Sequence, residues 1–222
     1  MKLVVFDCDG TLVDSQYMIH EAMNRAATTI NVESPDISVV RRVVGLSLDE
    51  AMARLFPYIE PEQLFHLVEG YKGAFQTLRD EMGEREMLYP GIKRLVNRLD
   101  KEGYLLAVAT GKSMRGLTRT LDHHGMSDLF ISLQTADHHP GKPHPSMIEK
   151  AMNDAGASYD QTVMIGDTSF DMQMAQNARV GGIGVNWGYH DDHELLNHGA
   201  RSVVKDSDHL RQEIEQFFAK GR

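Results

Sequence analysis

The sequence predicts an α/β protein with a doubly wound parallel sheet and an all-helical cap inserted after the first strand. Three observations lead to this prediction. Residues 4–6 form an apolar run that ends in Asp7, residues 15–86 show helical periodicity without a convincing strand, and strand and helix patterns alternate after Gly91. Strands that alternate with helices are typical of parallel sheets covered on both faces. We therefore expect a core from residues 1–14 and 87–222 and a cap from residues 15–86.

The cap is predicted as four helices. Apolar residues recur at helical spacing over residues 15–30, 35–45, 47–57 and from 61 onwards. Ser15 is expected to cap the first of these helices, because serine is favoured at helix N-termini. Ser47 and Glu50 have the spacing of a capping box for the third helix.

The core is predicted as alternating elements. We expect helices over residues 92–101, 113–124, 145–155 and 169–179, and strands over residues 104–110, 129–133, 162–165 and 182–185. A short helix, a strand over residues 202–204 and a terminal helix are expected to follow. The first strand belongs to the same sheet, so the cap interrupts the core in sequence.

Length, charge and cysteine content exclude several classes of function. A chain of 222 residues suits one domain of average size with a smaller one. The net charge of −9 argues against nucleic acid as a partner, because phosphate backbones bind basic surfaces. The single cysteine, Cys8, excludes an internal disulfide, and no apolar stretch is long enough for a signal peptide or a membrane span. We expect a cytoplasmic protein of undetermined oligomeric state.

Polar side chains follow several predicted strands at the point where each strand ends. They are Asp7 and Asp9 after the first strand, Thr110 and Gly111 after the next, Lys142 ahead of a helix, and Asp167 and Asp171 after a later strand. Because ligands bind beyond the carboxyl ends of parallel strands, we expect these groups to converge. Asp7 and Asp9 start out on the same side of an extended strand, and two carboxylates this close favour a cation between them, above all Mg²⁺.

These residue types suit phosphoryl transfer. Asp7 would attack phosphorus as a nucleophile, while Asp9 would protonate the leaving oxygen and then activate water. Asp167 would add a second carboxylate to the metal, and Asp171 would orient Asp167, the metal's waters or the loop amides. The phosphate oxygens would be bound by the remaining polar groups: the Thr110 hydroxyl, the Gly111 amide and the Lys142 ammonium.

Four motifs in a fixed order carry a family resemblance. They are DCDGT at residues 7–11, ATGK at 109–112, GKPHP at 141–145 and GDTSFD at 166–171. Together they resemble the haloacid dehalogenase superfamily, in the branch with a small helical cap, and are most similar to its phosphoglycolate phosphatases. The resemblance spans nearly the whole chain and implies a Rossmann-like core.

The resemblance also implies a mechanism. It makes Asp7 the nucleophile and Asp9 the acid/base, with Thr110 and Lys142 as phosphate ligands. It implies a Mg²⁺ ion held by Asp7, the Asp9 backbone carbonyl and Asp167. The implied activity is hydrolysis of a small phosphomonoester, 2-phosphoglycolate or a similar metabolite, through an aspartyl-phosphate intermediate.

Three departures separate the chain from neighbouring branches. The dehalogenases lack an aspartate at the position of Asp9. Phosphonate-cleaving members need a Schiff-base lysine in the cap, where this chain has only Lys72, late in the fourth helix. The β-phosphoglucomutases carry an arginine where this chain has Leu48. Hydrolysis is therefore favoured, with a phosphomutase or phosphotransferase, or a signalling module that only accepts phosphate, as alternatives.

The remaining predictions concern individual side chains. Gly45-Leu46-Ser47 matches the family's substrate-specificity loop, and Arg42 either contacts the substrate or belongs to a solvated helix face. Arg41 is expected on that solvated face, and Lys112 is expected to face solvent. The Cys8 thiol is expected to be buried and protonated between two carboxylates. The eleven histidines lack a zinc motif and are expected mainly at the surface.

Overall fold

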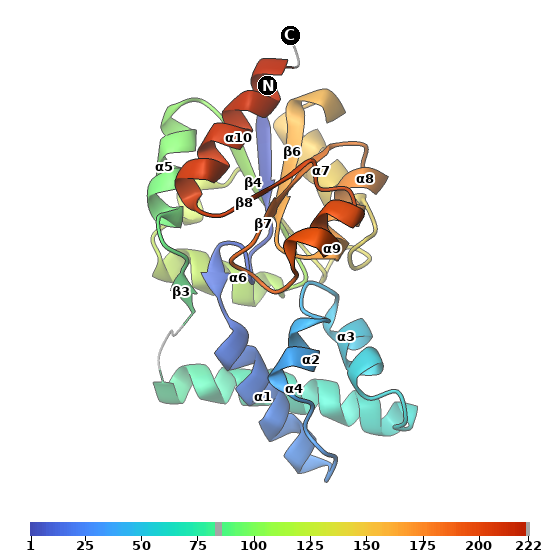
Figure 1. The fold of residues 1–222 in the computed structure, drawn as a ribbon. Helices are drawn as coiled ribbons and strands as arrows, with labels where there is room; N and C mark the ends of the chain where they lie inside the picture. The colour runs from blue at the N-terminus through green and yellow to red at the C-terminus, as the bar shows by residue number, and fades with distance from the viewer. Residues whose placement is uncertain (83–85, 221–222) are drawn as a thin grey trace.

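The computed structural model describes residues 1–82 and 86–220 and is built around a six-stranded parallel sheet with strand order β5-β4-β1-β6-β7-β8 (Figure 1). The strands of this sheet are β1 Leu3–Phe6, β4 Leu105–Thr110, β5 Ser132–Thr135, β6 Thr162–Gly166, β7 Gly181–Val185 and β8 Ser202–Val204. The helices that follow them in sequence are α5 Ile92–Lys101, α6 Met114–His123, α7 Ser146–Ala155, α8 Ser169–Asn177, α9 Asp192–Asn197 and α10 Ser207–Lys220. The predicted fold class is confirmed.

Each face of the sheet has its own apolar layer, because side chains alternate along a strand. Val4 and Phe6 of β1 lie in a buried cluster with α5, α6 and α10, whereas Leu3 and Val5 lie in a second cluster with α7 and α8. All four of these side chains are fully buried. The carboxyl end of β1 is therefore held at the centre of a rigid three-layer structure.

A helical segment, residues 15–82, lies beyond the carboxyl edge of the sheet (Figure 1). Its helices are α1 Gln16–Thr29, α2 Ile37–Arg41, α3 Leu48–Leu55 and α4 Pro61–Met82. The two long helices, α1 and α4, pack along each other, and the segment has an apolar cluster of its own that includes Met23, Met52 and Leu67.

The chain leaves and re-enters the core at one place. Strand β2, Val13–Asp14, precedes the helical segment, and strand β3, Met87–Leu88, follows it. The two strands pair antiparallel, with Val13 opposite Leu88 and Asp14 opposite Met87. This small ladder was not predicted, because two-residue strands carry no periodicity. The predicted boundary at residues 86/87 lies next to residues 83–85, which are outside the described residues, as are 221–222 at the predicted terminal helix.

Several predicted details need correction. The strand predicted over residues 129–133 begins only at Ser132, because a 3₁₀ turn, Ser127–Leu129, precedes it and Phe130 packs edge-on against Phe6. The capping box predicted at Ser47 does not form, since its side chain makes no cap hydrogen bond. Ser15 does precede α1, but its hydroxyl likewise makes no cap bond and is used elsewhere.

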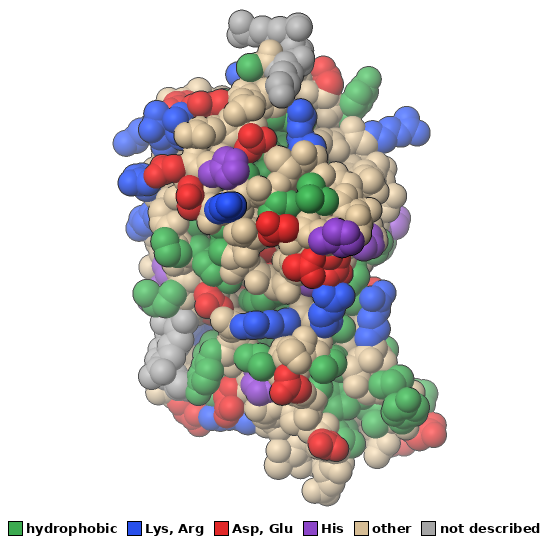
Figure 2. Space-filling model, in the orientation of Figure 1, with side chains coloured by type: hydrophobic (Ala, Val, Ile, Leu, Met, Phe, Trp, Pro, Cys, Tyr) green, Lys and Arg blue, Asp and Glu red, His purple; other side chains and the backbone are tan. Residues whose placement is uncertain are grey.

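The surface in view carries acidic and basic side chains in alternation rather than one extended patch (Figure 2). Basic and acidic groups lie side by side at the junction between the helical segment and the core. One such contact is the ion pair of Arg42, after α2, with Glu194 of α9, at 2.6 Å. Within the described ranges 1–82 and 86–220, no helix has both the length and the apolar character needed to cross a bilayer.

Candidate active site

Three buried carboxylates meet at the carboxyl ends of β1 and β6. Asp7 follows β1 directly, Asp167 follows β6, and Asp171 lies in the first turn of α8. One oxygen from each of the three lies within 4.8 Å of the others, and each side chain is essentially inaccessible to solvent. The sheet therefore brings together acidic groups that are up to 164 positions apart, which is the difference between 171 and 7.

Lys142 is the cation of this cluster. Its ammonium lies 2.7 Å from Asp7 Oδ1 and 2.6 Å from Asp171 Oδ1, and the side chain is fully buried. Asp7 Oδ1 also accepts a hydrogen bond from the Cys8 amide at 2.7 Å. The other oxygen, Asp7 Oδ2, is buried and accepts no hydrogen bond from any residue that the structure describes. The nucleophile candidate is thus held by one oxygen, and its second oxygen is unpaired.

Asp167 sits in a slot that two glycines keep open. A Cβ atom on Gly10 would lie 2.2 Å from its carboxylate, and one on Gly188 would lie 2.3 Å from it. Gly10 also has a φ of +86°, a conformation that glycine adopts without strain. The Thr11 hydroxyl donates to Asp167 Oδ1 at 2.7 Å, and the Tyr189 amide donates to Oδ2 at 3.0 Å. The loop after β7 therefore completes the acidic site.

Asp171 fixes the loop that carries Asp167. Its Oδ2 accepts from the Thr168 amide and hydroxyl, at 3.0 and 2.7 Å, and the two residues form a capping box at the start of α8. Its Oδ1 accepts from Lys142. Both oxygens are occupied by protein groups, so Asp171 holds the loop in place and joins it to Lys142.

The charge balance of the cluster favours a divalent cation. Three carboxylates share one ammonium, and burial raises the pKa of Asp7 to about 7 despite the opposing charge of Lys142. Burial and the nearby Asp171 and Asp7 raise the pKa of Asp167 well above its usual range. A hard cation would offset this repulsion, and carboxylate oxygens are the ligands that such a cation takes. The residues present therefore fit a divalent metal.

Asp9 is held by a different lysine. Asp9 Oδ1 accepts from the Ser15 hydroxyl at 2.6 Å and from the Lys112 ammonium at 2.7 Å. The Lys112 side chain is only 8% exposed and also contacts Glu86 at 2.8 Å. The prediction that Lys112 faces solvent is therefore wrong. Its partners lie 103 and 26 positions away, so no local pattern could have revealed them.

Glu86 is the centre of a second buried network. Its Oε2 accepts from the Arg79 guanidinium and from the Thr120 hydroxyl, each at 2.7 Å, while Oε1 faces Lys112. Burial alone would raise the pKa of Glu86, but the charges of Lys112 and Arg79 outweigh it and lower the pKa to about 2. Glu86 stands immediately before β3 and had not been singled out from the sequence.

The loop between α2 and α3 closes over the strand ends. A Cβ atom on Gly111 would lie 2.4 Å from the Leu46 carbonyl oxygen, and one on Gly141 would lie 3.1 Å from Ser47 Cβ. Gly45 has a φ of +101°, and a Cβ atom at this position would lie 3.1 Å from the Thr168 hydroxyl oxygen. The predicted specificity loop therefore lies against the residues that follow β4, β5 and β6.

Comparison with known proteins identifies the family. The model of the haloacid dehalogenase-like hydrolases matches residues 4–185. The chain belongs to this family. It is 35% identical to a probable phosphatase, IndB, from Dickeya dadantii over 87% of this chain and 84% of that protein. It is 29% identical to a phosphoglycolate phosphatase from Vibrio cholerae over 89% of each chain.

Solved structures of similar proteins agree with this assignment. A predicted phosphatase from Clostridium acetobutylicum superimposes with a TM-score of 0.87 at 26% identity, covering 97% of this chain and 98% of that one. A hydrolase from Pseudomonas syringae gives a TM-score of 0.85 at 28% identity, covering 97% and 99%. The predicted family and enzyme class are thus confirmed for this haloacid dehalogenase-like hydrolase.

In this hydrolase a cavity of about 500 Å³ separates the acidic site from the helical segment. Asp7, Asp9, Thr110 and Gly111 line its floor. Its other walls are mainly apolar side chains of the helical segment, among them Ile19, Met23, Val43, Leu48, Tyr71 and Phe75. Gly45 and Ser47 also line it.

Arg41, the last residue of α2, and Arg42, the residue after it, do not line this cavity. Arg42 is 56% exposed in its side chain and pairs with Glu194. Arg41 hydrogen-bonds to Gln16, and its Nε is buried, so the prediction of a solvated face is wrong for Arg41. Helix α2 points these side chains towards α1 and α9 rather than over the acidic site.

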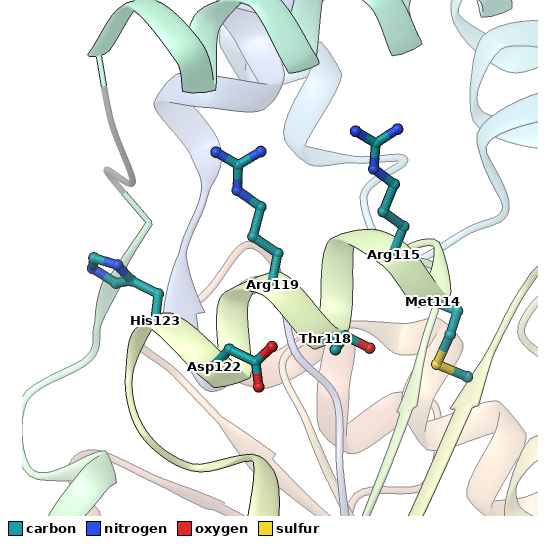
Figure 3. Close-up of a pocket in the computed structure, with 6 residues that line it drawn as sticks. All are labelled: Met114, Arg115, Thr118, Arg119, Asp122 and His123. Carbon is teal, nitrogen blue, oxygen red and sulfur yellow. The ribbon is translucent and has the colours of Figure 1, made fainter.

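A second hollow lies on the outer side of α6 (Figure 3). Arg115 and Arg119 point from α6 towards α4, where Arg115 donates to Gln76 at 3.0 Å and Arg119 lies 3.8 Å from Asp80 (Figure 3). Asp122 is the single carboxylate among its lining residues. These contacts tie the helical segment to the core, and the acidic site lies elsewhere.

Two further outcomes concern residues near the site. Cys8 is buried, and burial together with Asp9 raises the pKa of its thiol well above the usual range, as predicted.

His190 departs from the expectation of surface histidines. It is 4% exposed, and its Nδ1 accepts from the Ser169 amide at 3.1 Å. The ring therefore holds the first residue of α8. Among the described residues, the cluster of side chains that could bind a metal consists of aspartates and contains no histidine.

Proposed function

We propose that the protein is a Mg²⁺-dependent phosphatase that hydrolyses a small phosphomonoester through an aspartyl-phosphate on Asp7. The observation that carries the proposal is Asp7 Oδ2, an unpaired buried oxygen at the floor of the cavity, beside two further carboxylates and one ammonium. An oxygen without a hydrogen-bond donor keeps its lone pairs for a phosphorus atom or a metal. Family membership and relatives that are named phosphatases support the same reaction.

Two steps account for the turnover. In the first, Asp7 Oδ2 attacks phosphorus, the bond to the leaving oxygen breaks, and Asp9 gives its proton to that oxygen. In the second, ionised Asp9 takes a proton from water as the water attacks the aspartyl-phosphate. Inorganic phosphate leaves, Asp7 is regenerated, and Asp9 is again protonated.

Three groups are proposed to bind the phosphate. Thr110, the last residue of β4, offers its hydroxyl and Gly111, the next residue, its amide at the cavity floor, and Lys142 supplies a positive charge beside Asp7. Asp7, Asp167 and the Asp9 backbone carbonyl would hold Mg²⁺, with Asp171 in support. When bound, the ion supplies charge that offsets the phosphate's own negative charge.

Residues 15–86 are proposed to act as the cap, and residues 1–14 and 87–222 as the core, with residues 83–85 of this division outside the described part. The apolar walls of the cavity would surround the leaving group and exclude bulk water during transfer. Gly45 and Ser47, which line this cavity, are the proposed cap contacts to that group.

The decisive experiment measures phosphate release from a panel of phosphorylated metabolites and aryl phosphates, with Mg²⁺ and with excess chelator. The panel includes 2-phosphoglycolate, sugar phosphates and nucleotides. We expect Mg²⁺-dependent release by the natural protein and none by Asp7→Asn, while Asp100→Asn, an exposed change on α5, keeps full activity. Full activity of Asp7→Asn, or in excess chelator, would disprove the proposal.

Two other outcomes would redirect the assignment. A long-lived phosphoaspartate without turnover would indicate a phospho-acceptor module. Conversion of a sugar 1-phosphate to a 6-phosphate without release of phosphate would indicate a mutase.

A further inference from the structure

We propose that Lys112 is a positioning residue that aims Asp9 at the leaving-group oxygen, and that Glu86 holds Lys112 in place for this purpose. The inference rests on the proposed phosphatase function, in which Asp9 protonates the leaving oxygen. It goes beyond that function because Lys112 and Glu86 belong to neither the phosphate site nor the acidic cluster.

The hydrogen bonds of Asp9 are all on one of its two oxygens. Ser15 and Lys112 both donate to Oδ1, at 2.6 and 2.7 Å, and Oδ2 has no hydrogen-bond partner in residues 1–82 and 86–220. The side chain is 12% exposed, and Asp9 lines the cavity. Two donors on Oδ1 prevent the carboxyl group from turning about its bond. They leave Oδ2 as the oxygen that can exchange a proton with a bound substrate.

Lys112 is in turn fixed from its other side. Its ammonium lies 2.8 Å from Glu86 Oε1, and the Glu86 carboxylate is fully buried. Arg79 and Thr120 each donate to Glu86 Oε2 at 2.7 Å, so this carboxylate is anchored to α4 and α6. The centroid of the Phe75 ring lies 5.7 Å from the Lys112 ammonium, so the ring covers another side of this group. Lysine side chains at a surface are flexible, whereas the contacts with Asp9 and Glu86 restrict Lys112 to one conformation.

The groups that hold Asp9, either directly or through Lys112, come from both connections of the helical segment. Ser15 stands directly before α1, and Glu86 stands directly before β3. The orientation of Asp9 therefore depends on where the chain leaves and re-enters the core. The hydrogen bonds that orient Asp9 therefore form only when Ser15 and Glu86 both hold these positions against the core.

The test uses two substrates that differ in the acidity of the leaving group but have similar size. Phenyl phosphate releases a weakly acidic phenol, which needs a proton as it departs, whereas 4-nitrophenyl phosphate releases a stable anion. General acid catalysis typically contributes 10²- to 10⁴-fold to a rate. Because kcat/KM reports the steps up to departure of the first product, it isolates the action of Asp9 as an acid from its later action on water.

In Lys112→Met we expect kcat/KM to fall on the order of 100-fold for phenyl phosphate and less than about 10-fold for 4-nitrophenyl phosphate. Retained turnover of the nitrophenyl ester shows that the variant is folded and that Asp7 still reacts. The double variant Lys112→Met with Glu86→Gln removes both charges of this ion pair and keeps an amide oxygen at position 86 that can accept from Arg79 and Thr120, and the same selective loss is expected. Lys150→Met, a matched removal of an exposed lysine on α7, should change neither value.

An equal loss with both substrates, or no loss with either, would overturn the role of Lys112. Failure of the phosphatase proposal itself would look different, because the natural protein would then hydrolyse neither ester.

Discussion

Lys142 Nζ lies 2.7 Å from Asp7 Oδ1 in an ion pair that is shielded from solvent. Two residues further along the chain, Asp9 Oδ1 is paired with Lys112 at the same distance. Each carboxylate of the DxD motif thus has its own lysine on Oδ1, and in each the Oδ2 atom carries no hydrogen bond within the described residues. The two lysines come from different loops, so the roles of the two aspartates can be disturbed separately.

Replacing Lys142 by methionine should destabilise the protein as well as inactivate it. The change leaves three buried carboxylates without their ammonium, and breaking a buried ion pair typically costs about 3–5 kcal/mol. Chemical denaturation should show a loss of this size in the free energy of unfolding. Lys150→Met removes an exposed lysine whose carboxylate partner is Asp154, and it should cost less than about 1 kcal/mol. Equal, small losses in both variants would contradict the prediction.

Binding of a divalent cation should be linked to release of a proton. The pKa of Asp7 is raised to about 7 without a cation, so below that pH the carboxyl group is protonated and must ionise before it binds metal. The apparent Kd for Mg²⁺ should therefore rise at least about tenfold for each pH unit below 7, because the raised pKa of Asp167 can only add to the proton release. Calorimetry in buffers of different ionisation enthalpy measures the proton directly. An affinity that does not change between about pH 5 and 7 would refute the linkage.

Glu86→Gln should lower stability at neutral pH and lose its effect in acid. The pKa of Glu86 is lowered from 4.5 to about 2, so its ionised form stabilises the folded state fully above pH 4.5. This contribution, on the order of 3 kcal/mol, is lost as the pH falls towards 2. The unfolding free energies of variant and natural protein should therefore converge from about pH 4.5 downwards. Glu50→Gln, in an exposed pair with Arg54, should show no such convergence.

Gly111→Ala should impair the approach of the helical segment to the core. A methyl group at this position would lie 2.4 Å from the Leu46 carbonyl oxygen, which is part of the backbone. We expect kcat/KM for phosphate release to fall at least about tenfold, because small displacements from productive geometry are costly. At Gly73 an added methyl meets no described atom within 4 Å apart from its chain neighbours and its own helix backbone, so Gly73→Ala should leave activity unchanged while stabilising α4 slightly. Comparable kinetics for the two variants would argue against close packing at Gly111 during turnover.

Site residues that directly follow strands could be predicted from the sequence. The ends of β1 and β6 could be located from apolar runs, and the rule that ligands bind at the carboxyl edge then places Asp7 and Asp167 together. Lys142 was predicted at this edge as well, because its motif lies between a strand and a helix. Topology alone brings these groups within contact distance.

Contacts between the helical segment and the core could not be predicted in the same way. Lys112 has no local feature that distinguishes it from an exposed lysine, since its partners come from two distant parts of the chain. Ser15 and Ser47 have the usual pattern of helix caps, yet the Ser15 hydroxyl binds Asp9 and Ser47 packs against Gly141. Tertiary contacts replaced the local hydrogen bonds that serine pattern rules assume.

The short β2–β3 ladder places Asp14 directly opposite Met87, so the two ends of the inserted helices are neighbours in space. A segment attached in this way can change in length or be exchanged for another without altering the order or register of the six parallel strands. Replacement of this one continuous helical segment could therefore change the substrate preference while the catalytic core stays the same.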